Sequence, residues 1–97
     1  MGEALEQYVA VTLSITLTRS GGYRVVYVIR YAKASAASGF TIPRTAQLRA
    51  LLQRFALTPE AIEQVLTTVQ AGSSELLRLG HIDHDHAERV LRSYAQW

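Results

Sequence analysis

Three histidines and three carboxylates crowd into residues 81–88, which read HIDHDHAE. Neutral imidazole and carboxylate groups are the ligands that zinc and nickel ions prefer in proteins. His84 and Glu88 would also lie one turn apart on a helix. This composition makes the segment a candidate metal site, although it contains no HExxH pair and no second, distant group of ligands. The candidate metal ligands are His81, His84 and His86.

The same cluster has a simpler interpretation as the start of a helix. Asp83 and Asp85 are residues that helix N-termini favour, and the histidines would then be solvated. A third interpretation is a pH-sensitive switch, because neighbouring histidines gain charge together in mildly acidic solution. Catalysis has little support, since no nucleophile in the sequence is placed to converge on a histidine base. We therefore expect no enzymatic activity and no bound cofactor.

The charge of the chain is unevenly distributed, although the formal net charge is only +2. Residues 7–59 contain seven basic residues and no acid, whereas residues 60–97 contain six acids and three arginines. Such an asymmetry indicates an anionic partner for the front half, or simply attraction between the two halves. The candidate nucleic-acid contacts are Arg19, Arg24, Arg30, Lys33, Arg49 and Arg54.

A second nucleic-acid signal lies in the segment LQRFALTPEAIEQV, residues 52–65. It resembles the turn of helix-turn-helix DNA-binding proteins, in which a small residue, an apolar residue and a capping Ser or Thr introduce the recognition helix. The resemblance implies DNA contacts from the second helix. The sequence departs from that pattern at Ala56, where glycine is usual, and at Glu60, Glu63 and Gln64, whose exposed side chains would face phosphates.

Residues 8–32 have the alternating pattern of a β-hairpin. Apolar residues occupy odd positions in two runs, Val9–Leu17 and Tyr23–Tyr31, on either side of a glycine pair. A three-residue loop with Gly22 in the left-handed conformation pairs Leu17 with Val25 and puts the large apolar residues on one face. A two-residue loop would instead place arginines among the leucines. The predicted polar face carries Thr12, Ser14, Thr16, Thr18, Arg24 and Arg30.

The rest of the chain is predicted to be a loop over residues 33–41 and helices over residues 42–97. The first helix starts within residues 41–43 and has an apolar stripe at Leu48, Leu51, Leu52 and Phe55. Thr58 and Pro59 mark the start of the second helix. This helix is predicted to continue to about Leu79 and to end at Gly80, with a break at Gly72 and a short separate helix capped by Ser73 as the alternative. Asp83, or else Asp85, caps the third helix.

These patterns predict one small α+β domain over residues 1–97. A two-stranded antiparallel hairpin packs on two to three helices, in the order ββαα(α), and a second copy could extend its sheet. The expected function is that of a small non-enzymatic binding or regulatory protein acting through protein–protein contacts, of phage or mobile-element type as one option. Nucleic-acid binding is the first alternative and metal binding the second.

The expected partners are a second copy of the chain, which would make a homodimer, and an unidentified protein, with nucleic acid as the alternative. No membrane association is expected, because the longest apolar run, Val9–Leu17, is interrupted by hydroxyl residues. Glu3 and Glu6 stand where a signal peptide would carry positive charge. The chain has no cysteine, which fits a cytoplasmic location.

Overall fold

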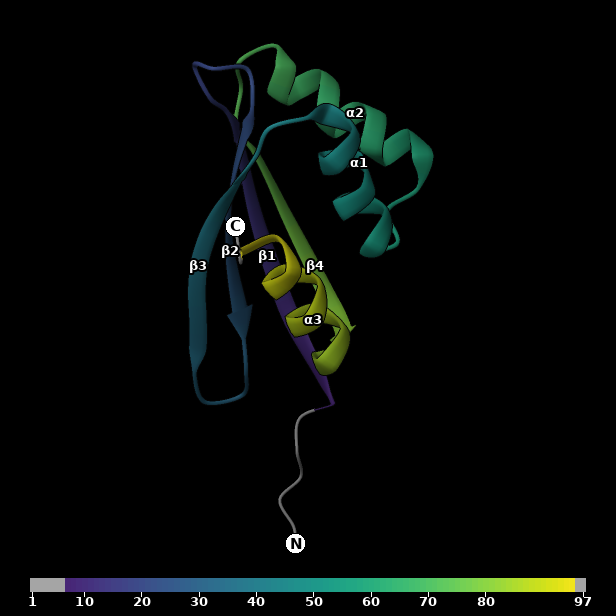
Figure 1. Ribbon diagram of the computed structural model, residues 1–97. Coiled ribbons are helices and arrows are strands. Elements are labelled where there is room, and N and C mark those ends of the chain that lie inside the picture. The colour runs from purple at the N-terminus through teal and green to yellow at the C-terminus, as the bar shows by residue number, and fades with distance from the viewer. Residues whose placement is uncertain (1–6, 96–97) are drawn as a thin grey trace, which may run out of the picture.

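The computed structural model describes residues 7–95 and builds one four-stranded sheet with three helices (Figure 1). Three strands come first, two helices follow, and the last strand precedes the last helix. The elements in chain order are β1 (Tyr8–Leu17), β2 (Tyr23–Arg30), β3 (Ser35–Ile42), α1 (Thr45–Arg54), α2 (Pro59–Gln70), β4 (Glu75–Asp83) and α3 (His84–Ala95).

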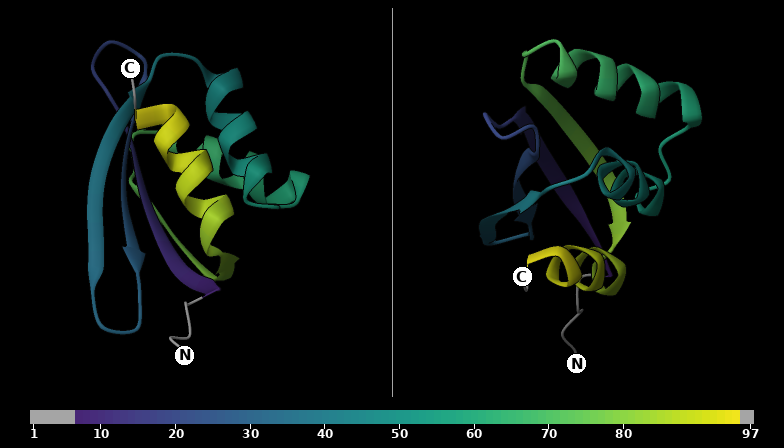
Figure 2. Two further views of the ribbon diagram at one scale, coloured as in Figure 1. Left: turned by 60° about the horizontal axis from the view of Figure 1, so that its bottom comes forward. Right: turned by 45° about the horizontal axis from the view of Figure 1, so that its top comes forward.

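The sheet has the strand order β3-β2-β1-β4, and every neighbouring pair is antiparallel. All three helices lie against the same face, as the two views of Figure 2 show. The predicted α+β class holds, but the predicted two-stranded hairpin with the order ββαα(α) is wrong. The hairpin gains a strand on each side from its own chain, so no second copy is needed to complete a four-stranded sheet.

The third strand, β3, occupies the segment that was predicted to be a loop over residues 33–41. Its small residues give no alternating pattern, so the sequence carries no strand signal there. The strand forms because its backbone pairs with β2, where Ala36 lies opposite Ile29 and Phe40 opposite Val25. Only Phe40 and Ile42 of β3 are buried. Backbone pairing, and not side-chain burial, therefore defines most of this strand.

The fourth strand, β4, replaces the predicted continuation of the second helix to Leu79. The helix ends at Gln70, and Gly72 has a φ of +96° that breaks the helical path. The break at Gly72 was the alternative prediction, but a strand follows it instead of a short helix. Leu77 pairs with Leu13 and Leu79 with Val11, so that the edge of β1 is hydrogen-bonded. Gly80 lies within β4 and does not end a helix.

The β1–β2 hairpin has the predicted faces but a different register. Leu17 pairs with Tyr23, and Ile15 with Val25, two residues away from the predicted pairing. The loop therefore spans residues 18–22, and the positive φ of +90° falls on Gly21 and not on Gly22. Because the shift is an even number of residues, each side chain keeps its predicted face. Gly22 is needed for another reason, since an added Cβ would lie 2.9 Å from the carbonyl oxygen of Ile42.

The helix starts follow local capping rules where the sequence has a capping residue. The hydroxyl of Thr58 accepts a hydrogen bond from the amide of Ala61 at 3.1 Å. A carboxylate oxygen of Asp83 accepts one from the amide of His86 at 3.0 Å. Both predicted caps are confirmed. The first helix begins at Thr45, after the predicted start within residues 41–43, and its N-cap residue Arg44 makes no capping side-chain bond.

The core lies between the sheet and the helices. Val11, Leu13 and Ile15 of β1 are fully buried beneath apolar residues of α1, α2 and α3. The predicted stripe of the first helix faces this core, with Leu48, Leu51 and Leu52 fully buried and Phe55 nearly so. Within residues 7–95, no helix is both long enough and apolar enough to cross a membrane.

Candidate functional site

The face of the sheet opposite the helices is not covered by any element in the described part of the chain. Side chains alternate along a strand, so the residues between the buried ones point to this side. We call this surface the open face. Its members are Ala10, Thr12, Ser14 and Thr16 of β1; Arg24, Val26, Val28 and Arg30 of β2; Ser35, Ala37, Gly39 and Thr41 of β3; and Leu76 and Arg78 of β4.

The open face, as defined by these residues, carries three arginines, and the acid on the same side of the described strands is Asp83, which lies opposite Tyr8 at the end of β4 and caps α3. Arg24 and Arg30 are exposed at opposite ends of β2, six residues and thus about 20 Å apart. Arg78 is exposed on β4, two strands away from β2. Hydroxyl side chains of β1 lie between these two strands. Guanidinium and hydroxyl groups are the side chains that most often contact phosphates, so the face is suited to a polyanion.

A hollow of about 490 Å³ opens on this face between Arg30 and Arg78. The register explains it, because Ala10 of β1 pairs with Arg30, while Arg78 pairs with Thr12 on the other side of β1. Ala10 and Gly80 contribute little side-chain volume between the two long arginine side chains. The hollow is lined by Ala10, Val11, Thr12, Arg30, Leu76, Arg78, Leu79 and Gly80.

An aromatic pair lies on β1 and β4 next to this hollow. The rings of Tyr8 and His81 are stacked, with centroids 5.1 Å apart and planes 8° from parallel. Tyr8 precedes Ala10 by two residues on the same side of β1, which is about 7 Å along the strand. The Tyr8 side chain is 50% exposed, and His81 is also exposed. An exposed aromatic stack beside arginines is a surface on which a nucleobase can stack.

The structure separates the predicted nucleic-acid contacts into two groups. Arg24 and Arg30 lie on the open face, and Arg19 and Lys33 are exposed in the turns before and after β2. The other two, Arg49 and Arg54, lie on α1, on the helical side of the sheet. Arg78 and Tyr8 are not among the residues predicted from the sequence. The apolar–polar–apolar order of Leu77, Arg78 and Leu79 is the sequence signal that would have placed Arg78 on a strand face.

The three predicted metal ligands have separate partners. His81 stacks on Tyr8, whereas His84 Nε2 lies 2.9 Å from Glu88. His86 Nε2 donates a hydrogen bond to the carbonyl oxygen of Arg54 at 2.6 Å. Among residues 7–95 there is no group of three or more histidine, aspartate or glutamate side chains that could hold a metal ion. The geometry gives the metal prediction no support.

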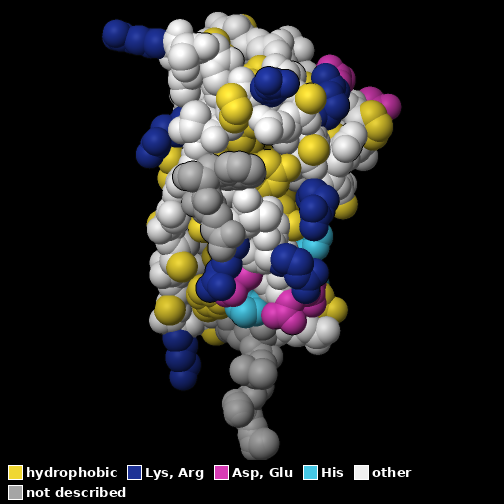
Figure 3. Space-filling view, in the orientation of Figure 1, with side chains coloured by type: hydrophobic (Ala, Val, Ile, Leu, Met, Phe, Trp, Pro, Cys, Tyr) yellow, Lys and Arg dark blue, Asp and Glu magenta, His cyan; other side chains and the backbone are white. Residues whose placement is uncertain are grey.

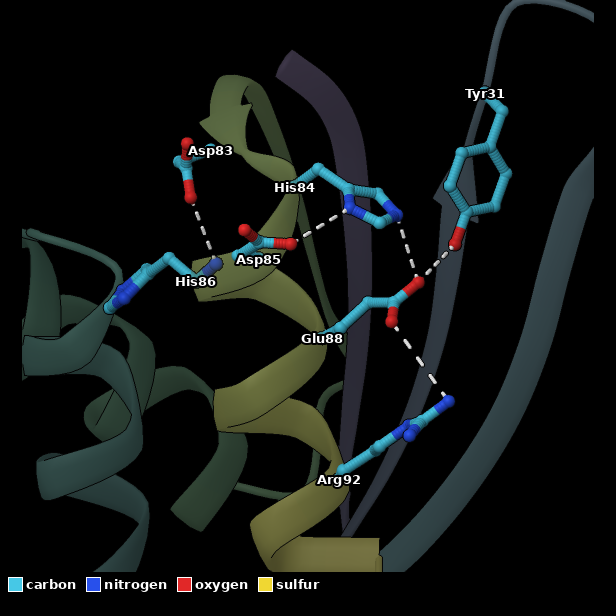
Figure 4. A network of polar contacts seen from close by, with 7 residues as sticks. All are labelled: Tyr31, Asp83, His84, Asp85, His86, Glu88 and Arg92. Carbon is cyan, nitrogen blue, oxygen red and sulfur yellow. Dashed lines mark hydrogen bonds and ion pairs between the residues drawn. The ribbon is translucent and has the colours of Figure 1, made fainter. Parts of the chain in front are cut away.

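His84 and Glu88 belong to a polar network that connects α3 to Tyr31, the residue directly after β2 (Figure 4). Glu88 is its centre, because one carboxylate oxygen accepts a 2.9 Å hydrogen bond from the hydroxyl of Tyr31 and also lies 2.9 Å from His84. Arg92 approaches the other oxygen at 3.9 Å, and Asp85 lies 3.4 Å from the second nitrogen of His84. These contacts tie together the residues that begin α3, so we assign the network a structural role.

The network makes the free energy of unfolding depend on pH in the alkaline range. Burial, followed by the hydrogen bond to Glu88, raises the pKa of Tyr31 above its usual value of 10.0. The Tyr31 hydroxyl therefore loses its proton at a lower pH in the unfolded chain than in the folded protein. The contribution to the free energy of unfolding is fully present below pH 10 and is lost as the pH rises through the folded pKa.

Tyr31→Phe should lower the free energy of unfolding by about 1 kcal/mol at neutral pH, because it removes a hydrogen bond to a partly exposed carboxylate. It should also flatten the fall in stability between pH 9 and pH 11 relative to the unaltered protein. Urea unfolding followed by circular dichroism across this range measures both effects. An equally steep alkaline fall in the variant would contradict the assignment to Tyr31.

On the helical side, basic side chains lie close to acidic ones, as Figure 3 shows near its right edge and around the histidines. Arg49 of α1 forms an ion pair with Glu63 of α2. The α1–α2 hairpin does contain the turn seen in the sequence, and Ala56 has a φ of +63° where glycine is usual. Glu60 and Gln64 are exposed on α2. This surface is therefore less suited to phosphate contacts than the open face.

No protein-family model, no curated protein and no solved structure gives a significant match to this chain.

Proposed function

We propose that this protein binds single-stranded nucleic acid across the open face of its sheet. The observation that carries the proposal is the set of exposed arginines, Arg24, Arg30 and Arg78, on a sheet face that no helix covers among the described residues. The carboxylate on this side of the described strands, Asp83, lies at the end of β4 opposite Tyr8. Phosphate contacts of this kind supply most of the affinity of non-specific nucleic-acid binding. The aromatic pair of Tyr8 and His81 adds a surface for base stacking.

The shape of the open face favours a single strand over a duplex. A duplex is usually entered by a protruding helix or a two-stranded ribbon that fits its major groove. All three helices lie on the other side of this sheet (Figure 2). A single strand can instead lie along a sheet, with its phosphates near arginines and its bases stacked on side chains. The arginines are spread over about 20 Å along β2, which suits an extended strand of several nucleotides.

The charge of the open face disfavours a second copy of the chain as its partner. Two copies meeting through this face would bring three arginines of each copy together, against a single carboxylate per copy, Asp83, at the end of β4. A homodimer would thus use a different surface, such as the free edge of β3 or β4. An acidic protein is the alternative occupant, because Val26 and Leu76 are 39% and 52% exposed and provide apolar contact area. The binding experiment below distinguishes nucleic acid from an acidic protein as the partner of the open face.

The proposal is tested with a fluorescently labelled RNA or DNA strand of about 12 nucleotides, a length within the usual range of single-strand binding folds. Fluorescence anisotropy should show binding that weakens as salt increases. Replacing Arg24, Arg30 and Arg78 together by glutamine should weaken binding about 10-fold or more at low salt. The slope of log affinity against log salt should fall by about 2, because each lost phosphate contact contributes roughly 0.7.

The matched control replaces three arginines of the helical layer by glutamine and removes the same total charge. Its members are Arg44, Arg54 and Arg89. It should keep most of the affinity and of the salt slope. Equal weakening in the control would show that net charge, and not the open face, drives binding. A failure to bind any strand at low salt, or equal affinity for the matching duplex, would overturn the proposal, and the former result would turn attention to an acidic protein.

A further inference from the structure

We infer that the hollow between Arg30 and Arg78 is a site for one nucleotide, with its phosphate between the two guanidinium groups and its base on the Tyr8–His81 stack. The inference deepens the proposed function and rests on it for its biological meaning. The ligand class is a nucleotide, either free or within a strand, because both present the same phosphate and base. The argument depends on the hollow, on its charge and on the adjacent aromatic pair.

The phosphate position follows from the register of the sheet. Arg30 and Arg78 lie on the strands that flank β1, and both line the hollow. Their backbone positions are about 12 Å apart, which is two strand spacings and a two-residue offset. Two arginine side chains extending from such positions can both contact one phosphate placed between them. Thr12 lines the same hollow and contributes a hydroxyl. Ala10 and Gly80 leave the space that the phosphate and sugar require.

The base position follows from an irregularity in β4. The register between β1 and β4 shifts between Val9 and Val11, which is a β-bulge, and His81 has a φ of +56° at this point. A left-handed conformation is unfavourable for a residue with a side chain, and such strain is concentrated at functional sites. Bulges redirect side chains. Here the result is a histidine ring laid flat on Tyr8, directly after the glycine that lines the hollow.

The test uses nuclear magnetic resonance of the ¹⁵N-labelled protein, titrated separately with adenosine 5′-monophosphate, adenosine and inorganic phosphate. The monophosphate should shift the amide signals of residues around the hollow, and it should bind more tightly than either fragment alone. The residues expected to respond are Tyr8, Ala10, Thr12, Arg30, Arg78, Gly80 and His81. Shifts confined to the helical side, or none at millimolar nucleotide, would overturn the inference.

Three variants separate the phosphate contact from the base contact. Arg30→Gln combined with Arg78→Gln should abolish the response to both phosphate and the monophosphate. Tyr8→Ala should weaken the binding of the monophosphate about 5-fold or more, the loss expected for one stacked base. It should leave the affinity for inorganic phosphate unchanged. His81→Gly should have the same selective effect, and it should not unfold the protein because glycine accepts the positive φ. If it binds the monophosphate as tightly as the unaltered protein, the imidazole ring has no part in the site.

Arg24→Gln is the matched control, because Arg24 lies at the other end of β2 and does not line the hollow. It should leave the monophosphate affinity unchanged but weaken the binding of a 12-nucleotide strand. A strand that binds through the three arginines, with no monophosphate response at the hollow, would overturn this inference and leave the proposed function standing. Monophosphate binding at the hollow, without any binding of strands, would support the site and overturn the proposed function.

Discussion

Replacing Leu13 by alanine is expected to lower the free energy of unfolding by about 3–4 kcal/mol, the largest effect of any single change considered for this protein. Leu13 has no solvent exposure, and it lies at the centre of the sheet, paired with Tyr27 on β2 and with Leu77 on β4. Its removal leaves a cavity that three strands and their helices can fill only by moving together. A domain of this size is stabilised by only about 5–15 kcal/mol, so a large share would be lost.

Urea unfolding followed by far-ultraviolet circular dichroism measures this effect. Thr12→Val provides the matched control on the adjacent residue, because Thr12 points to the open face and valine keeps its shape and strand preference. The control should change the free energy of unfolding by less than about 1 kcal/mol. If the two variants were equally stable, the assignment of faces in β1 would be wrong.

The second large effect is expected at Gly22 in the β1–β2 turn. An added Cβ would lie 2.9 Å from the carbonyl oxygen of Ile42 and 3.4 Å from the Cα of Pro43. Both are backbone atoms at the junction of β3 and α1, so neither can move alone. Gly22→Ala should therefore lower the free energy of unfolding by about 2–3 kcal/mol, as overpacking typically does. It should also lower the midpoint temperature of thermal unfolding.

Gly21→Ala is the comparison that separates packing from backbone conformation. Gly21 has a φ of +90°, but an added Cβ would meet no atom within 4 Å. Its cost should be about 1 kcal/mol, the usual penalty for a side chain in the left-handed region. A larger loss at Gly21 than at Gly22 would mean that turn conformation, and not the close approach to Ile42, sets the stability of this end of the sheet.

The sequence predicts the hairpin because large apolar residues occupy every odd position of both strands, although Val26 and Val28 add apolar residues at even positions of the second. It predicts the helix starts at Thr58 and Asp83 because capping is local. It does not predict β3, whose small residues carry no period. That strand depends on the free edge of β2, which is a property of the assembled sheet. The register of the hairpin was also missed, since the alternating pattern is equally satisfied after a shift of two residues.

β4 was missed because its leucines satisfy two patterns. Leu76 and Leu77 continue the helical stripe of α2, yet Leu77 and Leu79 also fit the alternation of a strand. The pairing with β1 decides the outcome, and that pairing is not local. The candidate site shows the same limit. Arg24 and Arg30 were placed on the correct face, whereas Arg78 was assigned to a helix and joins them only through β4.

The position of β4 in the chain has a consequence for how the molecule is made. Thr12 pairs with Arg78, 66 residues later (78 − 12). The central strand β1 therefore cannot pair with β4 until most of the chain has been synthesised. Contacts between distant residues form slowly, because a long loop must close first. Until then, one edge of β1 and part of the apolar surface beside it are available to other nascent chains. We expect the ribosome-bound intermediate to need protection by chaperones during this interval.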